Sequence, residues 1–139
     1  MSVGRRSESD DGFPPLLNAI DVGMLEAVHP LLNAGTSLTA SGINGYTAIH
    51  RAASIDNADA VSLLAPLYDE IDIPDTDYSG WSALMVAAYV GSTSAAEVLL
   101  AHGANPELQD SDGQTAVDLA RVHGHEALAL ALREFRPPA

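Results

Sequence analysis

Residues 45–53 read GYTAIHRAA, and the same order of residue types returns as GWSALMVAA at 80–88 and GQTAVDLAR at 113–121. The leading glycines of these three segments are 35 and 33 residues apart. A weaker copy, PPLLNAI at 14–20, aligns with TAIHRAA at 47–53 and pairs Leu16 with Ile49 and Ala19 with Ala52. Self-similarity at a period of this size predicts a stacked repeat protein.

Each copy contains the signals of a short helical hairpin. A glycine ends a turn, and Thr47, Ser82 or Thr115 then supplies the hydroxyl of a helix N-cap. Apolar and small residues, alanine above all, follow and allow neighbouring helices to approach closely. In three copies a glycine separates this helix from a second one, namely Gly23, Gly91 and Gly124.

This pattern resembles the ankyrin repeat family, whose motif is close to D-x-x-G-x-T-P-L-H-x-A-A, followed by V-x-x-L-L and G-A. The best matches are GYTAIHRAA, DYSGWSALMVAAYVG with AAEVLLAHGAN, and DSDGQTAVDLARVHGHEAL. The resemblance implies an all-α solenoid of helix–turn–helix units joined by β-turn or hairpin fingers. It extends over residues 13–136, in repeats at approximately 13–40, 41–74, 75–107 and 108–136. Residues 1–12 are polar and lack periodicity, so we expect a disordered acidic tail.

Two departures from the family pattern predict local changes in the structure. Pro30 falls inside the second helix of the first repeat, where it should kink or shorten that helix. The second repeat has Tyr68 in place of its terminal glycine and two extra residues, so its finger should be longer and more acidic than the others.

The composition excludes several classes of function. The chain has 139 residues, no cysteine, and a net charge of -13, and all six of its positive residues are arginine. Such a surface repels a phosphate backbone, so direct nucleic-acid binding is disfavoured. No apolar run approaches the ~18 residues of a membrane-spanning helix. With no secretory signal, we expect a cytoplasmic protein, with the nucleus as the alternative in a eukaryote.

His50 lies three residues after Thr47, at the reciprocal position of a capping box. The equivalent residues are Met85 and Asp118, so the position is interpreted as structural rather than catalytic. His123 and His125, with His102 nearby in the preceding turn, form the strongest imitation of a zinc site. DTDYSGW at 75–81 imitates the start of a calcium loop, but Val86 replaces the required glutamate. We therefore predict no enzyme, metal or cofactor.

The resemblance leaves the finger residues and the two residues after the alanine pair free to bind a partner protein along a concave face. Four of the five Tyr and Trp side chains fall on these positions. The predicted partner-binding residues are Ile43, Asn44, Tyr46, Ser54, Ile55, Tyr78, Ser79, Trp81, Tyr89, Val90, Ser111, Asp112, Gln114, Val122 and His123. The acidic residues predicted to rim this face are Asp69, Glu70, Asp72, Asp75, Asp77, Asp110 and Asp112.

The leading hypothesis is a non-catalytic, monomeric interaction module acting as an adaptor, inhibitor or subunit. Its partner should be another protein with an apolar or Arg/Lys-rich segment, bound without membrane or nucleic acid. An alternative is an acidic decoy that occupies the cationic groove of a nucleic-acid-binding protein, by charge alone. A third reading is a zinc-dependent enzyme built on His102, His123 and His125.

Overall fold

The structure is a computed structural model that describes residues 15–35, 46–68, 71–74 and 80–135. The predicted tail at 1–12 lies outside the described residues. Helices follow one another in pairs, and no strand occurs within these ranges. The elements are α2 (Pro15–Val22), η2 (Leu25–Ala27), α3 (Val28–Asn33), α4 (Ala48–Ser54), α5 (Ala58–Leu64), η4 (Ala65–Leu67), α6 (Ala83–Val90), α7 (Thr93–Ala101), α8 (Ala116–Val122) and α9 (Glu126–Glu134).

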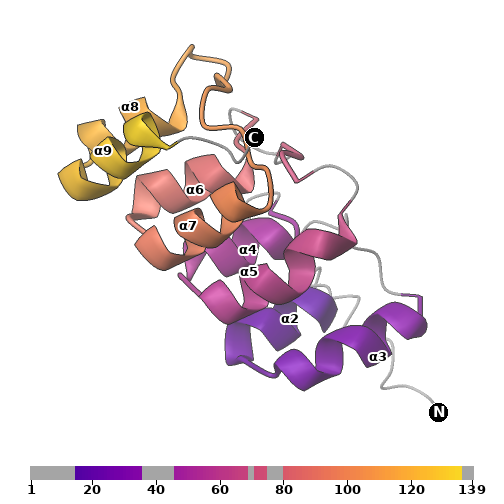
Figure 1. Ribbon diagram of the computed structural model, residues 1–139. Helices are drawn as coiled ribbons and strands as arrows, with labels where there is room; N and C mark the ends of the chain where they lie inside the picture. The colour runs from indigo at the N-terminus through magenta and orange to yellow at the C-terminus, as the bar shows by residue number, and fades with distance from the viewer. Residues whose placement is uncertain (1–14, 36–45, 69–70, 75–79, 136–139) are drawn as a thin grey trace.

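The helix pairs stack into two layers (Figure 1). The first helix of each pair contacts the first helix of the next, so that α2, α4, α6 and α8 form one continuous row, the inner row. In the other layer α5 packs on α7. This arrangement confirms the all-α solenoid of helix–turn–helix units.

Small side chains allow the inner row to pack closely. Ala52, Ala53, Ala87, Ala88 and Ala120 have no exposed surface. Larger residues such as Ile49 and Leu84 are buried in the same hydrophobic core. Because an alanine adds only one carbon to the backbone, two helices that meet through alanines can lie near the short end of the usual 8–10 Å spacing.

The predicted N-caps begin the inner helices. Ser82 Oγ accepts the Met85 N–H at 3.3 Å. Thr115 and Asp118 form a reciprocal capping box, with N–H to oxygen distances of 3.3 and 3.1 Å. These hydrogen bonds satisfy backbone N–H groups that a helix leaves without intrahelical partners.

His50 links two repeats and is fully buried. Its Nδ1 accepts the Thr47 N–H at 3.2 Å, so the ring proton is on Nε2. Nε2 donates it to the backbone carbonyl of Trp81, 2.8 Å away at the start of the next repeat. Both ring nitrogens are thus used by the scaffold.

The departure in the first repeat has the expected local effect, whereas most of the longer, acidic finger expected in the second repeat lies outside the described residues. In the first repeat the second helix is divided into η2 and a six-residue α3 that contains Pro30. In the second repeat α5 passes into η4, and Tyr68 follows in an extended conformation. The Tyr68 hydroxyl accepts the Ile49 N–H at 3.2 Å and so ties the end of this repeat back to its first helix.

Asp56 occupies the position that is glycine in the other three repeats and has a φ of 55°. Its Oδ1 accepts the Ala95 N–H of α7, in the next repeat, at 3.1 Å. Ser92, the N-cap of α7, makes no such bond, and its buried hydroxyl has no hydrogen-bond partner. Asp56 therefore caps a helix of the neighbouring repeat while tolerating a left-handed backbone.

We expect His50→Ala to lower the free energy of unfolding by about 2–4 kcal/mol, because it removes a buried ring and leaves the Trp81 carbonyl without its donor. Urea denaturation measures the change. Asp118→Ala is the matched control at the equivalent, partly exposed position and should cost only about 1 kcal/mol. Equal losses from the two substitutions would contradict the bridging role of His50.

Three substitutions at Asp56 separate its backbone role from its capping role. Asp56→Asn should be nearly neutral because it keeps both the acceptor and the tolerance of positive φ. Asp56→Gly should lose only the cap, about 1 kcal/mol, whereas Asp56→Ala should also incur backbone strain. Ser92→Ala should be neutral or stabilising, since it removes an unpaired buried hydroxyl. Thermal unfolding ranks the variants, and a strongly destabilised Asp56→Asn would contradict this account.

Candidate protein-interaction face

Three rings from two repeats form a contiguous group, which we term the ring ladder: Trp81, Tyr89 and His123. The centroids of Trp81 and Tyr89 are 4.9 Å apart, and those of Tyr89 and His123 are 4.3 Å apart. Trp81 precedes α6, Tyr89 lies in its last turn, and His123 is the C-cap of α8. All three were among the predicted binding residues, and packing of α6 against α8 brings them together.

Asp110, in the finger of the last repeat, connects the ring ladder to that finger by hydrogen bonds. Its Oδ2 accepts the Trp81 indole N–H at 2.8 Å, and its Oδ1 accepts the N–H groups of Asp112 and Gln114, each at 2.9 Å. The Asp110 carbonyl also accepts the Gly113 N–H at 3.0 Å, which closes a β-turn. The orientation of Trp81 is therefore coupled to the conformation of this finger.

Burial raises the pKa of the Asp110 carboxyl, but hydrogen bonds from Gln114, Trp81 and Asp112 outweigh that effect. The net result is a pKa below the ordinary value of 3.8. The charged form is favoured because every one of these donors stabilises a carboxylate more than a neutral acid.

The other predicted residues differ in accessibility. Ile55, Val90, Val122, Ser111 and Asp112 are exposed, while Ser54 and Gln114 are half-buried. Ile43, Asn44, Tyr78 and Ser79 lie outside the described residues.

Tyr46 requires a correction, because it is buried rather than free to meet a partner. It is 9% exposed and stacks on the buried His50 ring, with centroids 5.7 Å apart. The motif aligns Tyr46 with Trp81, but the two side chains make different contacts. The Trp81 indole N–H donates to Asp110 of the next repeat, whereas the Tyr46 ring packs against His50 of its own repeat. Equivalent positions in the motif thus differ in exposure.

Large apolar side chains are concentrated at the ends of the inner helices. Eight such side chains are exposed in the described part of the chain, and five of them occupy this one location. They form the apolar strip: Val22, Ile55, Tyr89, Val90 and Val122. Four of the five were predicted, and Val22 was missed, although the alignment of Leu16 with Ile49 also places Val22 opposite Ile55.

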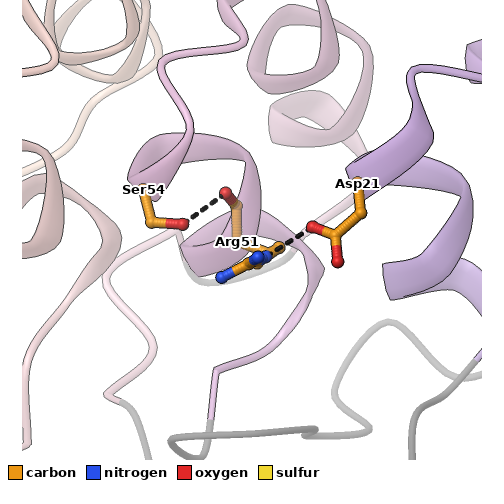
Figure 2. A network of polar contacts seen from close by, with 3 residues as sticks. All are labelled: Asp21, Arg51 and Ser54. Atoms are coloured by element: carbon orange, nitrogen blue, oxygen red, sulfur yellow. Dashed lines mark hydrogen bonds and ion pairs between the residues drawn. The ribbon is translucent and has the colours of Figure 1, made fainter.

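Several acidic side chains are already engaged within the protein. The Asp21 carboxylate of α2 forms an ion pair with the Arg51 side chain of α4. Figure 2 also shows the Ser54 hydroxyl donating a hydrogen bond to the backbone carbonyl of Arg51. Asp72, one of the predicted rim residues, accepts the Asn105 N–H. Asp112 is exposed, whereas Asp69, Glu70, Asp75 and Asp77 lie outside the described residues.

The three histidines of the zinc reading have separate contacts. His102 donates to the Val98 carbonyl at 3.0 Å, and His125 donates to the Tyr89 carbonyl at 3.2 Å while its ring covers Gly91. His123 packs on Tyr89. Within the described ranges no group of three or more His, Asp or Glu side chains is arranged to hold a metal ion. Most of the calcium-like segment at 75–81 is outside these ranges.

The geometry defines a repeat protein whose stacked helix pairs present an apolar and aromatic face. The sequence profile of ankyrin repeats (three copies) matches residues 16–110 and again 69–136. The chain belongs to the ankyrin repeat family. Repeats of this family generally mediate protein–protein interaction.

Similarity to individual proteins is confined to parts of much longer chains. The chain is 38% identical over 77 residues to the espin-like protein of Homo sapiens, covering 52% of this chain and 8% of the relative. It is 31% identical over 121 residues to the glycerophosphocholine phosphodiesterase gde1 of Schizosaccharomyces pombe, covering 86% of this chain and 11% of the relative. It is 46% identical over 57 residues to the ARF GTPase-activating protein GIT2 of Mus musculus, covering 41% of this chain and 8% of the relative.

The chain therefore spans about a tenth of the length of these relatives. Among the described residues, no helix has the length and apolar character needed to cross a membrane.

Asp110 should make the last finger sensitive to acid. Because its pKa is lowered by folding, its contribution to stability is complete above the ordinary value of 3.8 and is lost as pH falls through the lowered folded value. We expect Asp110→Asn to cost about 1–3 kcal/mol at neutral pH, and the difference from wild type to shrink below pH 3.8. Unfolding free energies measured across this pH range provide the test, with Asp112→Asn as control. A difference independent of pH would contradict the assignment.

Proposed function

We propose that the chain is a non-catalytic interaction module that binds another protein through the apolar strip and the ring ladder. The observation that carries the proposal is the concentration of exposed apolar side chains at the ends of the inner helices. Val22 is 60% exposed, Val90 45% and Val122 67%, although large apolar side chains are better accommodated out of water. A region in which exposed apolar side chains gather in this way is a candidate interaction site.

The ring ladder supplies the anchor of this face. Tyr89 is 43% exposed, and its ring contacts those of both Trp81 and His123. A ring fixed in this way loses little conformational freedom when a partner covers it. Tyr and Trp dominate interface hot spots because they bury a large area and retain a polar group.

Charge defines the kind of partner. The chain carries a net charge of -13, and two of the three described arginines, Arg51 and Arg121, pair with Asp21 and Asp118. An uncompensated negative surface favours a partner segment that combines apolar with arginine or lysine side chains. Encounter with such a segment should be faster at low ionic strength.

Affinity capture from the native extract tests the proposal with two matched variants. Tyr89→Ala/Val122→Ala removes two exposed side chains of the face, and Leu108→Ala/Leu130→Ala removes two exposed side chains outside it. We expect the first variant to lose the partner, by tenfold or more in affinity, and the second to retain it. Circular dichroism establishes that both are folded.

Two outcomes would contradict the proposal. If both variants retain the same partners and salt alone releases them, binding depends on charge and the acidic-decoy hypothesis replaces it. If the Leu108→Ala/Leu130→Ala variant alone loses the partner, the binding face lies elsewhere on the solenoid.

A further inference from the structure

The apolar strip has a regular spacing that describes the partner more closely. It crosses the four inner helices with one aliphatic side chain at the end of each, namely Val22, Ile55, Val90 and Val122. Since α2, α4, α6 and α8 are packed in that order, these side chains repeat at the spacing of packed helices, about 8–10 Å. The strip is therefore roughly 30 Å long.

An α-helix matches this spacing with one side chain per repeat. Residues seven apart on a helix lie on the same face and about 10 Å apart, so three such steps cover the strip. An extended strand fits less well, because residues three apart, at about 10 Å, point to opposite sides. A polyproline helix also repeats at about 9 Å, but it docks on grooves lined by aromatic rings, and the rings of this face, Trp81, Tyr89 and His123, lie at only one end of the strip.

The two ends of the strip differ in chemistry. Between Val22 and Ile55 lies an open groove of about 490 Å³, whose walls include Asp21, Asp56 and Asp59. Asp21 already pairs with Arg51 and Asp56 already accepts the Ala95 N–H, so the exposed Asp59 is the acidic side chain that a partner's cation would meet. At the other end, about two repeats away, the strip includes Tyr89, whose ring packs on His123. A cationic side chain complements the first end, and a bulky apolar side chain complements the second.

We infer that the strip binds a basic amphipathic α-helix of the partner protein. The helix lies across the inner helices, presents apolar residues at steps of seven, and places a lysine or arginine in the groove between Val22 and Ile55. A large apolar residue about 14 positions away, some 20 Å along the helix, meets Tyr89. This inference rests on the proposed function, since it describes the partner segment that the same face would hold.

Selection from a displayed library of random peptides about 22 residues long, enough for roughly 33 Å of helix, tests the inference without assuming a sequence. We expect the recovered peptides to share apolar residues at steps of seven together with lysine or arginine, and to gain helical circular dichroism when bound. Recovery of proline-rich or alternating sequences, or of no helical binder, would overturn the inference.

Variants at the acidic end locate the peptide. Val22→Lys/Ile55→Lys should weaken binding of the recovered peptide at least tenfold, and Asp59→Lys should weaken it and reduce its salt dependence. The milder Val22→Ser/Ile55→Ser variant guards against a folding defect, and Leu130→Lys is the control outside the strip. Unchanged binding by all strip variants would overturn the inference.

The native partner distinguishes failure of this inference from failure of the proposed function. If Tyr89→Ala/Val122→Ala releases that partner but Val22→Ser/Ile55→Ser does not, the face binds a protein but no helix spans the strip. If neither variant releases it, the proposed function itself is wrong.

Discussion

Every helix pair in this protein depends on its neighbour, because a pair of short helices has more apolar surface than it can bury alone. Contact through alanines such as Ala52 and Ala87 covers that surface and brings the backbones close together. At this short distance side chains of one repeat reach backbone groups of another. His50 donates to the Trp81 carbonyl, and Asp56 accepts from Ala95, so the repeats share their polar contacts as well as their core.

The same packing determines which surface remains available. Each inner helix ends at or next to an exposed aliphatic side chain, and the stacking of four repeats lines these side chains up as the apolar strip. The ring ladder follows from the same geometry, since Tyr89 and His123 meet only because α6 packs against α8. Stacking thus joins the exposed apolar side chains of the individual repeats into a surface longer than any single helix.

Some of the acidic side chains make contacts within the fold, and others are exposed to a partner. Asp21, Asp72 and Asp110 bind Arg51 or backbone and indole N–H groups, so part of the negative charge is spent within the fold. Asp59 and Asp112 are exposed and contribute to the field that a partner meets. Net charge therefore predicts the sign of the partner, while the geometry indicates where its cation is expected.

The sequence by itself determined the repeats, the N-caps at Ser82 and Thr115, the interruption at Pro30 and most of the exposed strip. These features arise from residues a few positions apart, and local patterns record them. Only the tertiary structure decided three other features. They are the burial of Tyr46, the helix cap supplied by Asp56, and the hydrogen bond from Trp81 to Asp110. The hydrogen bonds of Asp56 and Asp110 join residues 39 and 29 positions apart. Equivalent motif positions differ in such contacts because each one faces a different neighbour across the stack.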